Sequence, residues 1–401
     1  MTKSKDDVVI VAQARTPVGL FGGALRDYLG IDMATWVIKD LVKKAGLEDK
    51  TSEIGDVILG QMYHRNKEEP NVGRLAAWQA GLGDEVPGMT LQRACAVGLQ
   101  AIMTGAQEIM AGQCDIVIAG GTDSMSNAPY EVYGLRWGVK TMNQELFDGM
   151  YVPILACPPT GTGMGMTAEN LADKFDISRE EMDEYAVMSH QRAAKATKEG
   201  KFKGHIVQVT MPGKKGQPDK IFDTDEAIRA DLSLEKISQL KPVFKKGGKV
   251  TVANACPLND GAAAVILMRR SKAEELGLEP LATYRTGTVV GCDPDIMGYG
   301  PTKAAKKLME KNSWSASDID LYQIHEPFAP IPLTFKKEIG ISFDVMNLNG
   351  GPIAIGHAIG ATGATLSMIL IDEMKRQNVK RGLVGICQGT GMGTAVVFER
   401  D

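Results

Sequence analysis

Two of the six cysteines in the chain stand where thiol chemistry is feasible. Cys95 begins a segment with helical periodicity that runs to residue 112 and carries Glu108 as its one charged residue. A helix N-terminus lowers the pKa of a thiol, so we expect Cys95 to be an activated nucleophile. Cys387 ends an apolar run and precedes glycines at alternate positions, which allow backbone N–H groups to approach a ligand closely. A thiolate there is able to act as a base.

Two histidines have comparable settings. His357 follows a glycine-rich turn and enters a segment without charged residues, and His325 follows a predicted strand over 318–325. An isolated histidine of this kind is more often a core residue bonded to a backbone carbonyl. Beside a thiol, a neutral imidazole is able to take its proton and stabilise an oxyanion. These two histidines are therefore candidate partners of the cysteines.

The elements that must position these residues alternate between helix and strand, which indicates an α/β architecture. Helix-then-strand pairs are predicted at 31–46 with 56–60, 95–112 with 115–121, 303–311 with 318–325, and 357–374 with 382–387. The closing strands 261–270 and 393–401 also match. We infer an internal duplication that places Cys95 and His357 at equivalent positions, each at the start of a buried central helix.

The first copy is interrupted between about residues 122 and 249. This insert contains a charged helical segment over 168–199 and should form a separate domain over one face. A chain of 401 residues exceeds the size of a single hydrophobic core, so two or three packed domains are expected.

Eight short stretches make the chain resemble the thiolase family from end to end. They are Leu91–Ala101, Gly120–Tyr130, Met164–Asn170, Asn259–Ala264, Met297–Pro301, His325–Ala329 (His-Glu-Pro-Phe-Ala), Gly350–His357 and Cys387–Gly393. The resemblance implies the thiolase fold, with two duplicated mixed-sheet halves, central buried helices and an inserted loop domain. The implied domains are an N-terminal half over 1–121 with 250–272, a loop domain over 122–249 that binds coenzyme A and acyl groups and makes oligomer contacts, and a C-terminal half over 273–401.

The resemblance also implies the roles of the site residues. Cys95 would accept the acyl group as a thioester, activated by His357, and Cys387 would remove the α-proton of acetyl-CoA. The backbone N–H groups of Cys95 and Gly389 would form an oxyanion hole. His325 would stabilise an enolate oxygen in place of the Asn of short-chain members. Together with His357, these residues form the predicted catalytic site.

Substrate contacts are implied at positions matching the acyl pocket and the pantetheine site, namely Met164, Phe244, Ala255, Cys256, Met297 and Phe328. The chain departs from the family at several of its motif positions. His325 and Pro327 replace the usual Asn and Ala, Cys256-Pro257 replaces Ser-Gly, and Gly163 replaces a His. These departures bear on chain-length preference and on coenzyme A contacts.

The composition of the chain limits the kinds of partner that it is expected to bind. The formal net charge of −4 offers no basic field for nucleic acid. The uncharged run 352–371 has the length of a membrane span, but its polar and glycine residues favour a buried helix.

Without a secretory signal, reduced thiols in the cytoplasm are expected. Metal-ligand spacing and a dinucleotide-binding glycine motif are both missing, so neither a metal nor a permanently bound cofactor is expected. Basic residues such as Lys245 and Lys249 would either meet nucleotide phosphates or form a solvated face.

The sequence thus predicts an acyltransferase that condenses two acetyl-CoA molecules to acetoacetyl-CoA and coenzyme A, or cleaves 3-ketoacyl-CoA, by ping-pong transfer through Cys95. Alternatives are a longer-chain 3-ketoacyl-CoA thiolase of fatty-acid β-oxidation, a related condensing enzyme and a weakly catalytic scaffold subunit. The resemblance further implies a homodimer or homotetramer.

Overall fold

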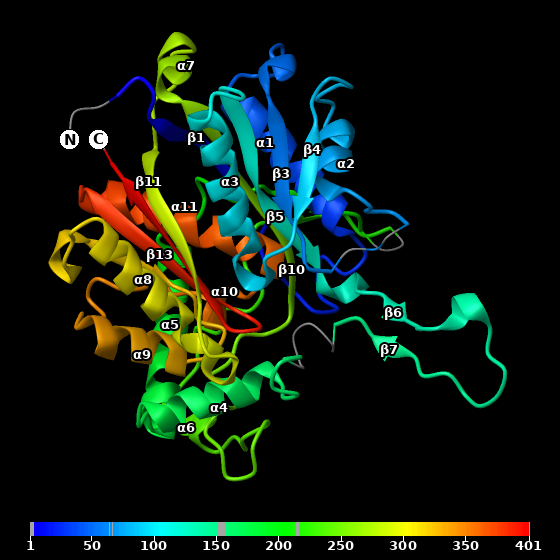
Figure 1. The fold of residues 1–401 in the computed structure, drawn as a ribbon, viewed down its shortest axis with the longest axis vertical. Coiled ribbons are helices and arrows are strands. Elements are labelled where there is room, and N and C mark those ends of the chain that lie inside the picture. The colour runs from blue at the N-terminus through cyan, green and yellow to red at the C-terminus, as the bar shows by residue number, and fades with distance from the viewer. Residues whose placement is uncertain (1–3, 64, 66, 151–156, 214–215, 401) are drawn as a thin grey trace.

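One ten-stranded mixed sheet forms the frame of the molecule (Figure 1). The computed structural model describes residues 4–400 except 64, 66, 151–156 and 214–215. The strand order is β12-β13-β14-β11-β1-β10-β5-β3-β4, with β2 beside β10. The strands are β1 (Val8–Arg15), β2 (Gly19–Leu20), β3 (Asp56–Gly60), β4 (Gly88–Leu91), β5 (Ile116–Ser124), β10 (Asn259–Arg269), β11 (Ala282–Gly291), β12 (Leu321–Ile324), β13 (Arg381–Gln388) and β14 (Met392–Glu399).

The sheet consists of two halves with the same connectivity. In the first half β3 is parallel to β5, β5 is antiparallel to β10, and β10 is antiparallel to β1. In the second half β12 is parallel to β13, β13 is antiparallel to β14, and β14 is antiparallel to β11. The halves join where Val9 and Ile10 of β1 pair with Thr283 and Ala282 of β11. The duplication predicted from the order of the elements is confirmed by this topology.

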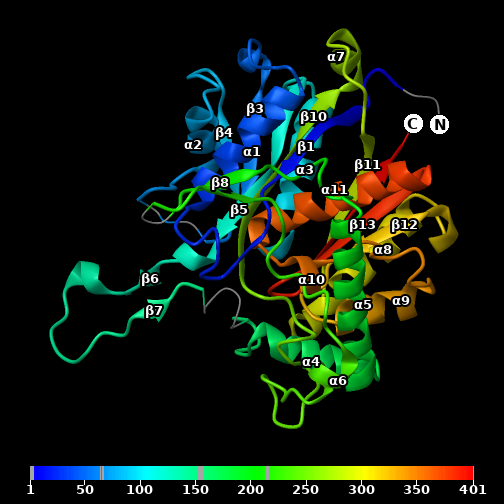
Figure 2. The same ribbon diagram turned by 180° about the vertical axis from the view of Figure 1, so that it is seen from behind.

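Helices cover and separate the two halves. Helices α1 (Gly30–Lys44) and α2 (Val72–Gln79) pack on the outer face of the first half. Helices α8 (Gly300–Lys311) and α9 (Pro330–Ile339) cover the outer face of the second half. Helices α3 (Val97–Met110) and α11 (Ile359–Gln377) lie between the halves (Figure 2). The layer order places the starts of both central helices deep inside the molecule.

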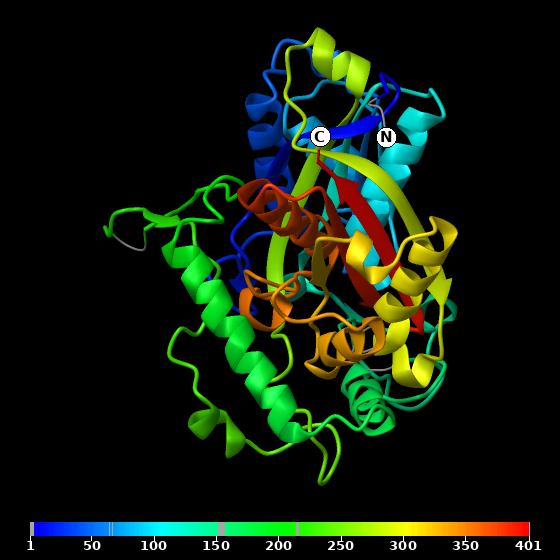
Figure 3. The ribbon, with the colours of Figure 1, turned by 90° about the vertical axis from the view of Figure 1, so that its left-hand side faces the viewer.

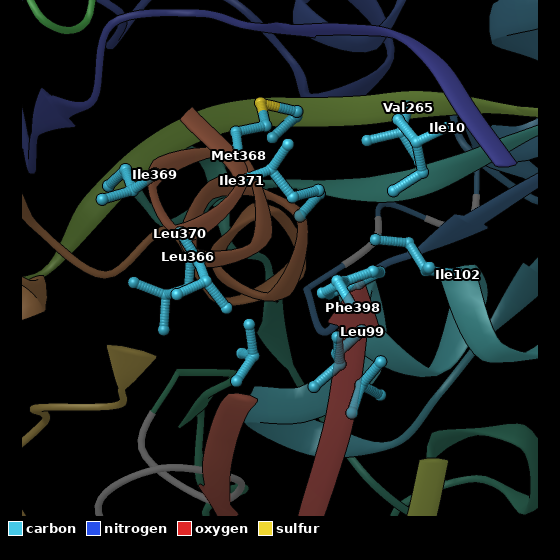
Figure 4. Packing of buried hydrophobic residues seen from close by; sticks show 14 of the residues in the cluster. Ile10, Leu99, Ile102, Val265, Leu366, Met368, Ile369, Leu370, Ile371 and Phe398 are labelled. Carbon is cyan, nitrogen blue, oxygen red and sulfur yellow. The ribbon is translucent and has the colours of Figure 1, made fainter. Parts of the chain in front are cut away.

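The central helices pack closely because they carry apolar and small residues. Leu99 and Ile102 of α3 face the same core as Leu366 and Ile369 of α11 (Figure 4). Gly363 of α11 permits this approach, since a Cβ there would lie 2.1 Å from the backbone nitrogen of Leu99 in α3. The burial of these side chains removes a large apolar area from water and fixes one helix against the other.

The uncharged run over 352–371 is buried, as its composition predicts, but it is not one helix. It forms α10 (Pro352–Ile355) and the first part of α11, which are separated by Gly356 with φ of 107°. In the part of the chain that the structure describes, none of the helices has both the length and the apolarity to cross a bilayer.

The chain between β5 and β10 leaves the sheet and builds the insert. Its first part is an arm that projects from the body, with the short strands β6 (Tyr130–Glu131) and β7 (Phe147–Asp148) at its base (Figure 1). The rest contains α4 (Met164–Lys174), α5 (Arg179–Lys198), α6 (Leu234–Ser238) and the hairpin β8 (Val209–Met211) with β9 (Lys220–Phe222). A short helix, α7 (Arg270–Glu275), follows β10.

The prediction of a single helical segment over 168–199 is wrong in one respect. The segment divides into α4 and α5, and Figure 3 shows α5 as a long separate helix at the side of the molecule. Asp176 has a left-handed φ of 51° between the two helices, and Ser178 starts α5 through a capping box with Glu181. This cap satisfies backbone N–H groups that a continuous helix would have bonded internally.

Candidate active site

Cys95 lies in a 3-10 turn (Ala94–Ala96) directly before α3, so the helix begins two residues later than predicted. The preceding residue, Ala94, has a φ of 44°, which is a strained value for a residue with a side chain. Gln92 supports this turn because its Oε1 accepts a hydrogen bond of 2.8 Å from the Ala94 N–H. Backbone strain of this kind is typical of residues that present a reactive group.

The pKa of Cys95 moves in the direction opposite to the one expected from its helix. Burial raises the pKa of the Cys95 thiol to about 11, opposed by backbone N–H groups of Gly389 and of Cys95 itself. The expectation that the helix N-terminus makes Cys95 a thiolate is therefore wrong, because desolvation outweighs the helix dipole. The resting group is a neutral thiol, and it needs a base to become a nucleophile.

His357 stands two residues before α11 and is fixed by its backbone. Its N–H donates a 2.7 Å hydrogen bond to Asn259 Oδ1, at the start of β10. Gly356 makes this possible, since its φ is 107° and a Cβ would lie 2.6 Å from Asn259 Nδ2. The first half of the molecule thus holds the backbone of a histidine that belongs to the second half.

The ring of His357 has a defined tautomer. Its Nδ1 lies 2.7 Å from Thr362 Oγ1, and that hydroxyl donates its proton to the carbonyl oxygen of Ala358 at 2.8 Å. The hydroxyl must then accept from Nδ1–H, which leaves Nε2 with its lone pair. Nε2 has no hydrogen-bond partner among the described residues. Burial lowers the pKa of His357 to about 3, so the ring is neutral and its free nitrogen is able to act as a base.

Cys387 and His325 form a second thiol–imidazole pair. His325 Nδ1 lies 3.3 Å from Cys387 Sγ, and both side chains are fully buried. Burial, together with the nearby Cys95 thiol, places the pKa of Cys387 well above its usual value. Burial, together with the neighbouring His357, places the pKa of His325 well below its usual value. Both groups are neutral at rest and a proton is able to pass between them.

A buried network around Glu326 holds the loop that carries His325. Glu326 accepts hydrogen bonds from Tyr185 Oη at 2.6 Å, Ser189 Oγ at 2.7 Å and Asn347 Nδ2 at 2.7 Å. Asn347 also donates to the carbonyl oxygen of Ile324 at 2.8 Å. The carboxylate therefore connects β12 to α5 of the insert. Sequence reasoning missed this role, although Glu326 lies within the His-Glu-Pro-Phe stretch.

The residues predicted to line the acyl pocket come together around Cys387. They share one apolar cluster with it, and the members named in advance are Met164, Phe244, Ala255, Met297 and Phe328. Phe244 and Phe328 meet edge to face with ring centroids 6.0 Å apart. The cluster joins α4 and the 244–255 segment of the insert to the loop that follows His325.

Cys256 and Pro327, two positions at which the chain departs from the family pattern, lie on two segments that pair with each other. The Cys256 N–H donates to the Pro327 carbonyl oxygen at 2.9 Å, and Ala255 forms a β-bridge with Phe328. Burial raises the pKa of the Cys256 thiol, and the Cys95 thiol adds to the effect. Cys256 is therefore a third thiol in this region.

The basic residues at 245 and 249 are engaged in ion pairs. Lys245 Nζ lies 2.7 Å and Lys249 Nζ 3.0 Å from the carboxylate of Asp173. Beneath them, buried Glu169 accepts the backbone N–H groups of Lys249 and Val250. Within the described ranges, no group of three or more His, Cys, Asp or Glu side chains has a metal-binding arrangement.

The fold and this arrangement of thiols and imidazoles define a thiolase-type α/β chain, and the chain belongs to the thiolase family. The family model for the thiolase N-terminal domain matches residues 8–271, and that for the C-terminal domain matches residues 278–400. The thiolase fold predicted from the sequence is thereby confirmed.

Individual relatives cover nearly the whole chain. The acetyl-CoA acetyltransferase of Chromobacterium violaceum is 44% identical over 394 residues, which is 98% of this chain and 100% of the relative. The crystal structure of the Bacillus anthracis acetyl-CoA acetyltransferase has a TM-score of 0.94 at 42% identity, covering 98% of each chain. Human mitochondrial 3-ketoacyl-CoA thiolase in complex with CoA has a TM-score of 0.93 at 34% identity, again covering 98% of each chain.

Proposed function

We propose that the chain is an acetyl-CoA acetyltransferase, which reversibly condenses two acetyl-CoA molecules to acetoacetyl-CoA and free coenzyme A. The observation that carries the proposal is one site that brings together the Cys387–His325 pair, the His357 ring 4.4 Å from that of His325, and the Cys95 thiol, which acts on the pKa of Cys387. In this proposal His357 is paired with Cys95 as its base. Relatives with the names given above support the same activity. Two separate pairs suit a reaction with one acyl-transfer step and one carbon deprotonation.

In the first step Cys95 attacks the thioester carbonyl of an acyl-CoA. Nε2 of His357 takes the thiol proton, the Cys95 S–C bond forms, and the bond from carbon to the coenzyme A sulfur breaks. The departing thiolate receives the proton from the imidazolium. The N–H groups of Cys95 and Gly389 that face the sulfur support an oxyanion hole for the tetrahedral intermediate.

In the second step Cys387 acts as the base. Transfer of its proton to His325 Nδ1 yields a thiolate and an imidazolium 3.3 Å apart. The thiolate removes the α-proton of a second acetyl-CoA, and the resulting carbanion attacks the acetyl-Cys95 thioester. The new C–C bond forms as the Cys95 S–C bond breaks, and the departing Cys95 thiolate takes up the proton held by His325. This yields acetoacetyl-CoA and restores the neutral thiol of Cys95 and the neutral ring of His325. The cationic His325 and His357 rings donate to the oxyanions that develop in the separate steps.

The substrate enters through the insert in this proposal. Met164, Phe244, Met297 and Phe328 share an apolar cluster with Cys387, and we propose that they line the acyl pocket and set the preference for an acetyl group. A small cavity lined in part by His190, Arg229, Val252 and Ala255 lies beside this cluster. It is too small to hold coenzyme A itself, and we propose that the pantetheine end of the substrate approaches Cys387 on this side. This proposal uses a division into three domains. They are an N-terminal half over 1–121 with 250–272, a loop domain over 122–249, and a C-terminal half over 273–401.

The proposed assembly is a homotetramer, in which the projecting arm contacts other copies. The arm between β6 and β7 exposes 88% of Trp137 and 89% of Met142, and Leu146 is also exposed. Large exposed apolar side chains on one segment mark an interaction site. The edge strand β4 is a second candidate contact. Light scattering of the intact chain, compared with a chain whose arm residues 132–146 are replaced by a short Gly-Ser turn, tests this: the shortened chain should be smaller.

Chemistry through free thiols requires a reducing compartment, so the proposed location is the cytoplasm. The six cysteines are all unpaired in the structure.

Intact-mass spectrometry after incubation with acetyl-CoA tests the activity. Wild-type protein and Cys387→Ala should gain one acetyl group, whereas Cys95→Ala should gain none. Coenzyme-A-dependent cleavage of acetoacetyl-CoA should be lost in both variants. A wild-type chain that neither gains the acetyl group nor cleaves a 3-ketoacyl-CoA would favour a scaffold subunit and refute the proposal.

A further inference from the structure

Asp123 is a fully buried carboxylate that none of the steps above uses. It lies near the end of β5, and its side chain has no exposed surface. Its Oδ1 accepts the backbone N–H groups of Met62 at 2.9 Å and Tyr63 at 2.8 Å. Its Oδ2 accepts the N–H of Gly360 at 2.6 Å. Three backbone N–H groups aimed at two oxygens are a binding arrangement for a carboxylate anion.

These hydrogen bonds connect the two halves of the molecule. Met62 and Tyr63 follow β3 in the first half, whereas Gly360 is the second residue of α11 in the second half. His357 stands three residues before Gly360, and its Nδ1 is held by Thr362 within the same turn. A negative charge also suits the N-terminus of α11, where unpaired N–H groups carry partial positive charge. A shift of this contact would move His357 relative to Cys95.

The carboxylate also acts on the nucleophile through its charge. Among the titratable groups around it are Cys95, Tyr63 and Glu69. The negative charge of Asp123 contributes to the raised pKa of Cys95. Burial in turn raises the pKa of Asp123 to about 8, opposed by the N–H groups of Tyr63, Gly360 and Met62. Above that pH Asp123 is charged, and its charge then opposes ionisation of the Cys95 thiol.

We propose that Asp123 is a positioning residue for the acyl-transfer step, which holds the start of α11 so that His357 faces Cys95. The proposal rests on the proposed function, because it assigns His357 as the base of Cys95. It differs from a general role in stability because the carboxylate accepts a hydrogen bond from the start of α11, close after His357.

Glu69 offers a matched control in the same molecule. It is also buried, with 2% exposure, and accepts the N–H of Ile31 at 2.7 Å. Ile31 is the second residue of α1, just as Gly360 is the second residue of α11. Helix α1 lies on the outer face and carries no proposed site residue. Loss of the Glu69 charge should therefore affect stability without affecting the reaction.

The experiment compares D123N and E69Q with the wild type in three measurements. These are kcat and KM for acetoacetyl-CoA thiolysis, the pH dependence of Cys95 alkylation by iodoacetamide followed by peptide mass spectrometry, and the melting temperature. For D123N we expect kcat to fall by about tenfold or more with KM changed less than about twofold, since the base His357 is no longer held in position for the reaction while substrate binding is kept. The alkylation midpoint should move to lower pH because a like charge beside the thiol is removed. E69Q should have a lower melting temperature than the wild type, but its kcat and its alkylation midpoint should equal the wild-type values.

A second variant separates position from charge. D123E keeps the negative charge but displaces the oxygens by one methylene, so it should lower kcat while retaining the wild-type alkylation midpoint. D123E also allows the proposal for Asp123 to be tested if D123N does not fold. Wild-type kcat in D123E, or an equal fall of kcat in E69Q, would overturn the proposal. If wild-type protein lacks thiolysis, the proposed function fails, and an unchanged alkylation midpoint in D123N would separately refute the link between Asp123 and Cys95.

Discussion

The rings of His325 and His357 meet edge to face with their centroids 4.4 Å apart. Each ring keeps an Nε2 without a partner among the residues that the structure describes. The proximity of His357 lowers the pKa of His325 further than burial does on its own. The two rings are therefore unable to carry protons together at low cost. In the proposed mechanism, this relationship separates the deprotonation of Cys95 from that of Cys387 in time, as a ping-pong reaction requires.

The Thr362 hydroxyl should determine the activity of His357 through its tautomer. Thr362→Val removes the acceptor of Nδ1–H, so the ring is free to carry its proton on Nε2, where it is unable to accept from Cys95. We expect kcat for thiolysis to fall by about ten- to a hundredfold, equivalent to about 1.4–2.8 kcal/mol, with little change in KM. Thr362→Ser keeps the hydroxyl and should retain most of the activity. Equal rates for the two variants would contradict this assignment of the tautomer.

Stability should decrease as pH falls below about 6.5. The pKa of His357 is lowered to about 3 in the folded chain, whereas an unfolded histidine titrates near 6.5. Between these values the unfolded state binds more protons, so acid favours unfolding by up to about 1.4 kcal/mol per pH unit for this residue. Buried His190, whose pKa is lowered to about 4, acts in the same direction.

Urea unfolding of the wild type and of His357→Gln at pH 7 and pH 5 measures the effect. The wild type should lose about 2 kcal/mol more than the variant over this interval, because glutamine does not titrate. The same pH dependence in both proteins would show that folding does not lower the pKa of His357.

Gly360 should tolerate no side chain. The Cβ of Gly360→Ala would lie 2.3 Å from the Thr122 carbonyl oxygen and 2.6 Å from that of Gly60, both of which are backbone atoms. We expect the free energy of unfolding to fall by about 3 kcal/mol through overpacking. Gly291→Ala is the control, since nothing lies within 4 Å of its Cβ position. Calorimetry of both variants checks the prediction, which fails if their melting temperatures are equal.

Glu326 should be a large contributor to the stability of the His325 loop. Glu326→Gln leaves one acceptor oxygen and turns an amide N–H₂ toward donors, so a loss of about 2–3 kcal/mol is expected. Tyr185→Phe in the same background removes one of those donors and should recover part of the loss. Chemical denaturation of the two single variants and the double variant measures the coupling. Strict additivity of the two changes would show that the network does not act as a unit.

Much of the framework could be predicted from the sequence because it depends on local patterns. The alternation of helix and strand, the duplication and the burial of the uncharged segments follow from periodicity and composition. The closeness of Met164, Phe244 and Phe328 came from the family resemblance, since no periodicity brings them together. These predictions concern which residues meet.

The sequence did not predict the protonation states of the site residues or the contacts that fix them. The pKa of Cys95 was expected to fall because a helix start is visible in the sequence, whereas the burial that raises it is a tertiary property. The break between α4 and α5 depends on a capping box at Ser178 whose signal was overlooked. Asp123 and Asn259 lie in motif stretches, yet their roles depend on partners far away in the chain.

The contact of Asp123 with Gly360 joins residues 237 positions apart. During synthesis, the first half is therefore complete long before α11 leaves the ribosome, and until then one side of α3 has no partner. Until then Cys95, the proposed nucleophile, lies in an incomplete site, and the apolar side of α3 is exposed to other nascent chains. Contacts that span so much of the chain slow folding, because the loop between them must be closed before they stabilise anything. The central packing that creates the site thus makes its assembly a late event in the folding of this chain.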